Sequence, residues 1–207
     1  LTGSQQFSLM KGITESLAGR VGIFELLPFS IAEKKIAYGV RKFSGTKNYF
    51  LDACLRGSYP ELTVRSALNR DEWYSAYVQT YLERDVRNFY NIGNLRDFQR
   101  FVELLAARCS QTLNLSACSS DLGVSVNTLK SWLSVLEASR IVYLLPAYYQ
   151  RFGKRLSKQP KIYFLDCGLV CYLLSIRDKE FILKNPMAGA LFENFCIQET
   201  LKCLRGR

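Results

Sequence analysis

The stretch LSACSSDLGVSVNTLKSWLSVL, residues 115–136, has the pattern of a helix, a tight turn and a second helix. Ser116 is placed to cap the first helix, and Gly123 supplies the conformational freedom that a turn needs. Ser125 is placed to accept a backbone N–H bond at the start of the second helix. The spacing therefore predicts a helix-turn-helix arrangement in the middle of the chain.

The second of these helices has one apolar and one polar face. Apolar residues recur at i, i+3, i+4 and i+7 and predict a buried stripe of Leu129, Trp132, Leu133 and Leu136. The opposite face carries Asn127, Thr128, Lys130, Ser131 and Ser134. A polar helix of this kind can approach a groove of nucleic acid. Lys130 is the only cation on that face, so base reading would rest on Asn127, Thr128 and Ser131.

A further helix and two strands flank this pair. The buried stripe of a helix directly before it is predicted by Phe98, Phe101, Val102, Leu105 and Cys109. Apolar runs at residues 141–145 and 161–165, bounded by Pro146 and Pro160, predict two strands. Three helices followed by a strand hairpin is the order of a winged helix-turn-helix, so we expect the hairpin to be a two-stranded wing.

The segment between the two predicted strands is strongly basic. Its sequence YYQRFGKRLSKQ, residues 148–159, carries Arg151, Lys154, Arg155 and Lys158, with Lys161 just beyond and no acidic residue among them. These charges fit contacts to phosphate groups while the second helix approaches a groove. The alternative is a solvated hairpin whose charges only keep the protein soluble.

The rest of the chain is predicted to be mainly helical. Helices are expected at residues 31–43, 49–55, 71–90, 168–174 and 189–204. Ser30 is placed to cap the first of them, and residues 178–184 are expected to be a polar connection. The last helix is expected to bury Phe192, Phe195, Cys196 and Thr200 or Leu201. The expected fold class is mainly α with a small β component.

Composition limits the classes of function. Lys and Arg outnumber Asp and Glu by 28 to 18 over 207 residues, which gives a net charge of +10. This charge favours a polyanionic partner such as DNA. The alternative is a piece of a longer protein whose acidic half is missing, which would show the same excess of basic residues. The absence of histidine excludes Ser-His and Cys-His catalysis. Seven cysteines without a C-x-x-C pair predict reduced core thiols and no metal site. No apolar run is long enough for a membrane span and no signal peptide is visible, so we expect a cytoplasmic protein with no membrane partner.

Eight segments together resemble a widespread prokaryotic ATPase family. They are LTGSQQF, SLAGR, GSYPEL, YVQTYLERDVR, LAAR, LSVLEASRIVYLLPAYY, PKIYFLDCGLVCYLL and GALFENF. Members of that family pair an N-terminal AAA-type P-loop module with a C-terminal domain of unknown function. That domain is similar to a winged helix joined to a restriction-endonuclease-like fold.

The resemblance implies roles for particular residues. Ser4 would lie near the nucleotide phosphates, and Arg20 would sense or stabilise the γ-phosphate. Residues from about 31 to 61 would be AAA lid-like helices, and Glu193 would be the first acidic residue of the nuclease-like fold. The resemblance also implies ATP and magnesium for full-length members, whereas no cofactor is expected for this chain alone.

We therefore expect an internal or truncated piece of a longer protein. Its expected parts are the remnant of an AAA-type module with a helical lid (1–65), a helical linker with the winged helix (66–175), and the start of a truncated nuclease-like domain (176–207). The phosphate-loop pattern G-x-x-x-x-G-K-[ST] is absent, as is the magnesium-binding Asp strand expected with it. This chain is accordingly not expected to hydrolyse ATP by itself.

The leading hypothesis for function is non-specific contact with nucleic acid. The residues expected to make it are Asn127, Lys130, Arg151, Lys154, Arg155 and Lys158. The alternative is an interaction module that packs against the missing ATPase core or a partner protein and binds no DNA. A third possibility, a complete enzyme, would require ATP hydrolysis by this chain.

Overall fold

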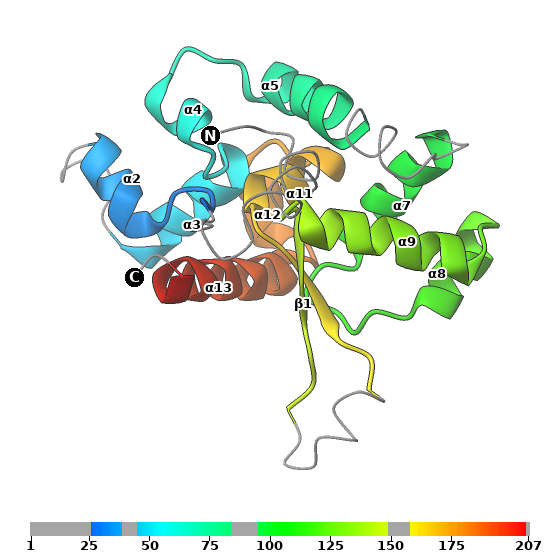
Figure 1. The fold of residues 1–207 in the computed structure, drawn as a ribbon. Coiled ribbons are helices and arrows are strands. Elements are labelled where there is room, and N and C mark those ends of the chain that lie inside the picture. Colours follow the sequence, from blue (N-terminus) through cyan, green and yellow to red (C-terminus); the bar gives the residue numbers. More distant parts are fainter. Residues whose placement is uncertain (1–25, 39–44, 84–94, 149–157, 206–207) are drawn as a thin grey trace, which may run out of the picture.

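The computed structural model describes residues 26–38, 45–83, 95–148 and 158–205 (Figure 1). These residues are mainly helical, with one two-stranded antiparallel sheet. The predicted fold class of mainly α with a small β component is confirmed at that level. Within these ranges, no helix combines the length and the apolar character that crossing a bilayer requires.

The described residues before position 84 form five short helical segments. They are α2 (Ile31–Tyr38), α3 (Thr46–Leu55), α4 (Pro60–Val64), α5 (Arg70–Tyr77) and the π-helical segment η1 (Val78–Glu83). α2 begins as predicted, because Ser30 and Glu33 form a capping box. The Ser30 hydroxyl accepts a bond from the Glu33 backbone N at 3.3 Å, and the Glu33 carboxylate accepts one from the Ser30 backbone N at 2.7 Å.

The predicted helix over residues 71–90 differs from the observed one. It begins one residue earlier, at Arg70, because the Asn69 side chain accepts bonds from two backbone N–H groups of the first turn. From Val78 to Glu83 the α-helix gives way to π-helical geometry, and residues 84–94 lie outside the described ranges. Two tyrosines of this helix differ in exposure, since Tyr74 is buried and Tyr77 is half-buried.

Three helices follow in the middle of the chain: α7 (Leu95–Ala107), α8 (Leu115–Leu122) and α9 (Val126–Ala138). The predicted helix, turn and helix over residues 115–136 are confirmed. Gly123 is left-handed (φ 70°), and the Ser125 hydroxyl accepts from the Thr128 backbone N. The predicted cap of α8 was wrong: Asn114 performs it, because its side chain reaches the Ala117 backbone N at 3.1 Å.

Strands β1 (Val142–Leu145) and β2 (Lys161–Phe164) pair antiparallel, within one residue of the predicted runs. Val142 lies opposite Phe164, and Leu145 lies opposite Lys161. Val142 is buried, the next three residues are half-buried, and Tyr148 is 82% exposed. The strand pair therefore leaves the core as it approaches the basic segment.

The chain continues through α11 (Cys167–Leu173), α12 (Lys179–Lys184) and α13 (Ala188–Arg205). The prediction of a polar connection at residues 178–184 was wrong. Asp178 caps this segment by accepting from the Phe181 backbone N at 2.6 Å, and Ile182 is fully buried. A cap and one buried apolar anchor are enough to hold a short helix against the core.

The buried face of α13 also differs from the prediction. Phe195 is buried as expected, but Phe192, Cys196 and Thr200 are exposed. The residues that α13 does bury are Leu191, Asn194, Phe195, Gln198 and Lys202. The hydrophobic pattern pointed to the wrong face because two polar residues of the buried face, Asn194 and Lys202, find hydrogen-bond partners in the core.

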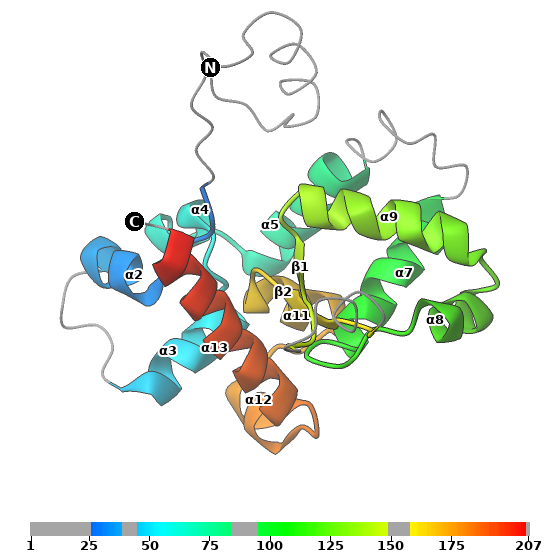
Figure 2. The ribbon, with the colours of Figure 1, turned by 60° about the horizontal axis from the view of Figure 1, so that its bottom comes forward.

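The helices gather on two sides of a central unit made of β1, β2 and α11. Figures 1 and 2 show α7, α8 and α9 on one side and α2, α3, α12 and α13 on the other. One hydrophobic cluster extends across the described chain from Tyr49 to Phe195. The core therefore continues across positions 65/66 and 175/176, and the expected division into parts remains a prediction.

A buried carboxylate joins the central unit to α5 and to the segment between α3 and α4. Asp166 is 1% exposed and accepts three bonds: from the Ser58 backbone N at 2.6 Å, the Tyr74 hydroxyl at 2.5 Å and the Leu169 backbone N at 2.8 Å. The Leu169 bond caps α11, while the other two hold the segment before α4 and the helix α5. Burial, followed by the Asp166 charge and hydrogen bond, raises the pKa of Tyr74 well above its ordinary value.

Two glycines make this junction possible. Gly57 has a left-handed φ of 84°, which an L side chain adopts with strain. A Cβ on Gly168 would overlap the Gly57 backbone and the Tyr74 hydroxyl. The segments GSYPEL and FLDCGL therefore meet backbone to backbone.

We predict that Asp166→Asn lowers the free energy of unfolding by about 2–4 kcal/mol, because an amide NH₂ replaces an oxygen that faces a buried donor. Urea denaturation followed by circular dichroism measures this loss. The matched control is Asp178→Asn at the exposed cap of α12, where Asn caps as well as Asp and the change should stay within about 0.5 kcal/mol. Equal losses in the two variants would contradict the role given to Asp166.

Candidate functional site

The α8–α9 pair is held by aromatic contacts from α7. Trp132 of α9 receives the rings of Phe98, edge-on at 5.6 Å, and Phe101, tilted at 5.9 Å. The predicted stripe of α9, Leu129, Trp132, Leu133 and Leu136, is buried. Sequence periodicity therefore oriented this helix correctly, with its polar face toward solvent.

The turn between α8 and α9 is fixed by side-chain bonds. The Ser119 hydroxyl donates to the Val124 carbonyl at 2.6 Å. Arg108, directly after α7, pairs with Asp121 of α8 at 2.5 Å. These contacts hold α8, the turn and the end of α7 in one arrangement.

The exposed face of α9 presents few free donors. Asn127, Lys130, Ser131 and Ser134 are exposed, whereas Thr128 is half-buried. The hydroxyls of Ser131 and Ser134 donate back to carbonyls of their own helix at 3.2 and 3.0 Å. Asn127 and Lys130 remain as the side chains best able to contact a ligand, which is too few for extensive base reading.

Most of the basic segment predicted to contact phosphates lies outside the described residues. Arg151, Lys154 and Arg155 fall in residues 149–157, while Lys158 is described and exposed. Ser4 and Arg20, the residues assigned by resemblance to nucleotide sensing, also fall outside. Their assignments therefore remain predictions.

Lys161, at the start of β2, is engaged by α13. Its Nζ lies 2.8 Å from Oε1 of Glu193, and the same oxygen accepts from the Tyr163 hydroxyl at 2.6 Å. Hydrogen bonds from Lys161 and then Tyr163 lower the pKa of Glu193. Burial and the bond to Glu193 raise the pKa of Tyr163 above its ordinary value. Glu193 thus fastens α13 to the sheet and removes one positive charge from the basic set.

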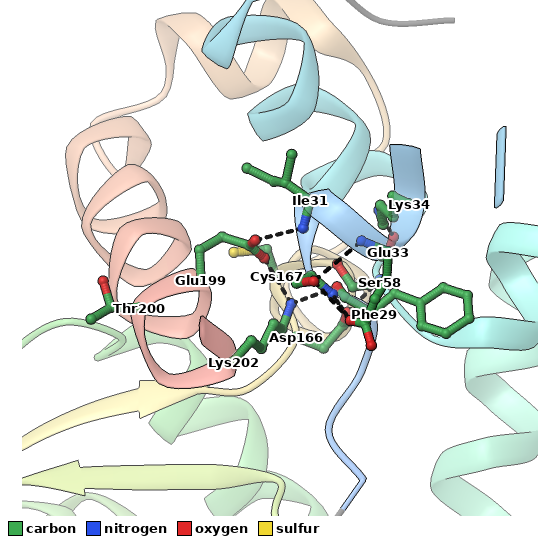
Figure 3. A network of polar contacts seen from close by, with 12 residues as sticks. Phe29, Ile31, Glu33, Lys34, Ser58, Asp166, Cys167, Glu199, Thr200 and Lys202 are labelled. Carbon is green, nitrogen blue, oxygen red and sulfur yellow. Dashed lines mark hydrogen bonds and ion pairs between the residues drawn. The ribbon is translucent and has the colours of Figure 1, made fainter. Parts of the chain in front are cut away.

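A second polar cluster lies where the chain enters the described fold (Figure 3). Lys202 Nζ donates to the Phe29 carbonyl at 3.0 Å and to Glu199 at 2.9 Å. The other Glu199 oxygen accepts from the Ile31 backbone N at 2.7 Å, and the Phe29 backbone N donates to the Ser58 carbonyl at 2.7 Å. Because the acid and the base are bound to each other and to backbone groups, this cluster organises chain packing rather than proton transfer.

The cysteines do not form a reactive or metal-binding centre in the part of the chain that is described. Five thiols are buried, and the prediction of core thiols was wrong only for Cys196 and Cys203, which are exposed. Hydrogen bonding to Cys167 and then Cys171, together with burial, raises the pKa of Cys54 well above its ordinary value. No group of three or more Cys, Asp or Glu side chains within the described ranges is arranged to hold a metal ion.

Sequence reasoning missed Asn194. Its buried side-chain amide makes both backbone hydrogen bonds of Phe164 in β2, as a residue of an adjacent strand would. It accepts from the Phe164 N at 2.8 Å and donates to the Phe164 carbonyl at 3.1 Å. It also contacts Cys109 at 3.1 Å and Cys167 at 3.3 Å. A polar residue between Phe192 and Phe195 is the only sequence signal, and it shows no partner by itself.

Comparison with known proteins gives a family and two distant relatives. A family model described as Domain of unknown function (DUF8612) matches residues 47–180. The curated relatives are "Uncharacterized protein Mb2031c" of Mycobacterium bovis and "Uncharacterized protein Rv2008c" of Mycobacterium tuberculosis. Each is 29% identical over 200 residues, which cover 96% of this chain and 43% of the relative. The chain therefore spans less than half the length of these relatives, and no solved structure matches it.

We predict that the contribution of Glu193 to stability depends on pH. Because its pKa in the folded state lies below the ordinary value of 4.5, the ionised group stabilises the fold above that value. The contribution is lost as the pH falls through the folded-state pKa. The difference in free energy of unfolding between wild type and Glu193→Gln should therefore be largest near neutral pH and shrink in acid.

Urea titrations over that pH range measure this difference. The control is Glu180→Gln, which removes an exposed carboxylate paired with Lys184 within α12. A Glu193→Gln difference that stays constant with pH would exclude an ionic contribution at this position.

Proposed function

We propose that this chain, which belongs to the family described as Domain of unknown function (DUF8612), is a winged-helix module that binds nucleic acid non-specifically through phosphate contacts. The observation that carries the proposal is the order of α7, α8, α9 and the β1–β2 pair. It presents the polar face of α9 in the same module as a basic strand connection. The net charge of +10 supports the same partner class.

Charge distribution favours phosphate contact over base reading. Residues 95–140, which include the three helices, carry five basic and four acidic side chains and are nearly neutral. The strand connection, in contrast, carries Arg151, Lys154, Arg155 and Lys158 without an acid. Lys161 counts for less because Glu193 neutralises it. The wing, rather than the second helix, is then the main source of affinity.

A second candidate function is an interaction module without nucleic-acid binding. It is favoured by three half-buried aromatic residues at the surface of the α4–α5 region. Trp73 and Tyr77 stack at 5.2 Å, and Tyr59 lies 4.9 Å from both rings. Aromatic side chains of this kind are enriched at protein interfaces. In this alternative, the partner is another protein or the remainder of a longer chain.

The AAA-type origin of the protein rests on the sequence resemblance. ATP and magnesium remain predictions for full-length members of that ATPase family, with Ser4, Arg20 and Glu193 as the residues assigned by resemblance. Of these, Glu193 is bound to Lys161 and Tyr163, so a nuclease-like role would require it to exchange those partners.

We predict that this chain binds a mixed-sequence DNA duplex with an affinity that falls steeply with salt. The slope of log K against log salt should be on the order of −3 to −4, because each cation of the wing neutralises about one phosphate. Changing Arg151, Lys154, Arg155 and Lys158 together to Ala should remove most of the binding. Fluorescence anisotropy at several salt concentrations measures both effects.

A matched variant removes the same charge elsewhere. Lys35, Lys47, Lys179 and Lys184 are exposed residues of α2, α3 and α12, and changing all four to Ala should leave most of the binding and its slope in place. Equal losses in the two variants would indicate attraction to net charge alone. Binding that is absent at low salt, or is unaffected by the wing variant, would favour the interaction module.

We also predict that Lys130→Ala weakens binding uniformly across DNA sequences and reduces the salt slope by about 1. Competition with duplexes of different sequence measures this. A loss confined to one base composition would mean that Lys130 reads bases. Ser134→Ala is the control, since its hydroxyl is bonded within α9.

A further inference from the structure

An exposed ion pair lies where the basic strand connection joins the sheet. Lys161, the first residue of β2, places its Nζ 2.8 Å from Oε1 of Glu193 on α13. The two side chains are 45% and 43% exposed, so solvent reaches both charges. Lys158 is also exposed, and the three positions between it and Lys161 span at most about 10 Å of chain. A phosphate backbone that runs past Lys158 therefore meets a second accessible cation at Lys161.

The backbone around Lys161 is fixed from both sides. On one side, β2 pairs with β1. On the other side, the Leu113 N donates to the Pro160 carbonyl at 2.8 Å. The Ile162 N donates to the Gln111 carbonyl at 3.0 Å on the same side. The Lys161 side chain, rather than the strand, is therefore the part that can change its partner.

The carboxylate of Glu193 has a second donor. Lys161 and Tyr163 lie two positions apart on β2 and therefore on the same face of the strand. The Tyr163 hydroxyl accordingly donates to the same Oε1 at 2.6 Å. If Lys161 leaves, the half-exposed Glu193 keeps this bond and its contact with water, so no buried charge loses its partner. Because exposed ion pairs contribute little to stability, a phosphate can compete for the lysine.

The pair of Arg108 with Asp121 is less suited to such an exchange. The Arg108 side chain is 23% exposed, about half the value for Lys161. Its guanidinium also contacts Sγ of Cys118 at 3.0 Å. A phosphate would have to displace two partners from a more enclosed cation, so Lys161 is the better candidate.

We propose a regulation that rests on the function proposed above: Glu193 restrains nucleic-acid binding by holding Lys161, and a phosphate of the bound nucleic acid takes this lysine over. Because two anions compete for one ammonium, the coupling is reciprocal. Pairing with Glu193 weakens the phosphate contact, and the phosphate contact releases α13 from Lys161. In the wild type, Lys161 therefore adds less affinity than a free cation of the wing.

Glu193→Gln tests this restraint, because the amide keeps an acceptor for Tyr163 but loses the charge that holds Lys161. Fluorescence anisotropy with a mixed-sequence DNA duplex should show binding about three- to tenfold tighter than wild type at about 50 mM salt. The slope of log K against log salt should become more negative by about 1, because one more phosphate is neutralised. Glu180→Gln is the matched control, since it frees Lys184 on α12 in the same way and should change the affinity less than about twofold.

Lysine acetylation followed by mass spectrometry measures the contact at Lys161 directly. In the wild type, the duplex should protect Lys158 more strongly than Lys161, whereas in Glu193→Gln it should protect both. Lys179, an exposed residue of α12, should be acetylated equally with and without DNA. Circular dichroism checks that the variants fold, and the wild-type comparison needs no variant.

The possible results separate this regulation from the proposed function. If the wild type binds but Glu193→Gln binds no more tightly than Glu180→Gln, the restraint is overturned and the proposed function stands. A Lys161 that the duplex leaves unprotected in Glu193→Gln has the same meaning, as does equal protection of Lys158 and Lys161 in the wild type. Absence of binding by both the wild type and Glu193→Gln at low salt overturns the proposed function and the regulation together.

Discussion

The described fold depends on the carboxylate of Asp166. It accepts bonds from Ser58, Tyr74 and Leu169, three groups on three separate segments, at a point from which water is excluded. A buried carboxylate costs several kcal/mol unless such donors surround it, so the three segments must assemble together. The contact of Gly57 with Gly168 follows from this requirement, because any side chain there would separate the donors from the acceptor.

The C-terminal helix α13 ties the N-terminal helices to the sheet through polar groups. α13 buries Asn194 against β2 and Lys202 against the Phe29 carbonyl, while Glu199 accepts from the start of α2. Each of these contacts is directional, so α13 has one position along the sheet rather than the sliding freedom of an apolar helix face. These polar contacts therefore hold the N-terminal helices and α13 against the sheet on which the α7–α9 unit also packs.

Charge pairing determines how the proposed nucleic-acid contact would work. Arg108 is paired with Asp121 and Lys161 with Glu193, so both basic residues hold the fold together instead of facing a partner freely. What remains is Lys130 on α9 and the basic strand connection. This distribution supports phosphate contact with little base selectivity, and it leaves the interaction-module alternative with a specific surface in Tyr59, Trp73 and Tyr77.

Local signals in the sequence determined the middle of the chain. Local patterns predicted the buried stripe of α9, the turn at Gly123, the cap at Ser125 and the two strands. Each of these features depends on residues within one or two helical turns of each other, or on a short run of apolar residues. The phosphate contacts assigned to the wing and the nucleotide-sensing roles of Ser4 and Arg20 stay predictions, since most of these residues lie outside the described ranges.

The tertiary structure alone decided which polar residues are buried and what they hold. Distant partners, at least thirty positions away in the sequence, determine the buried face of α13, the bond between Asp166 and Tyr74 and the pairing of Lys161 with Glu193. The helix α12 depends instead on its cap and on one buried residue, Ile182. Hydrophobic periodicity assigns a polar residue to solvent by default. Only the three-dimensional arrangement shows that buried hydrogen-bond partners face Asn194 and Lys202, which is why α13 buries these two residues while Phe192 remains exposed.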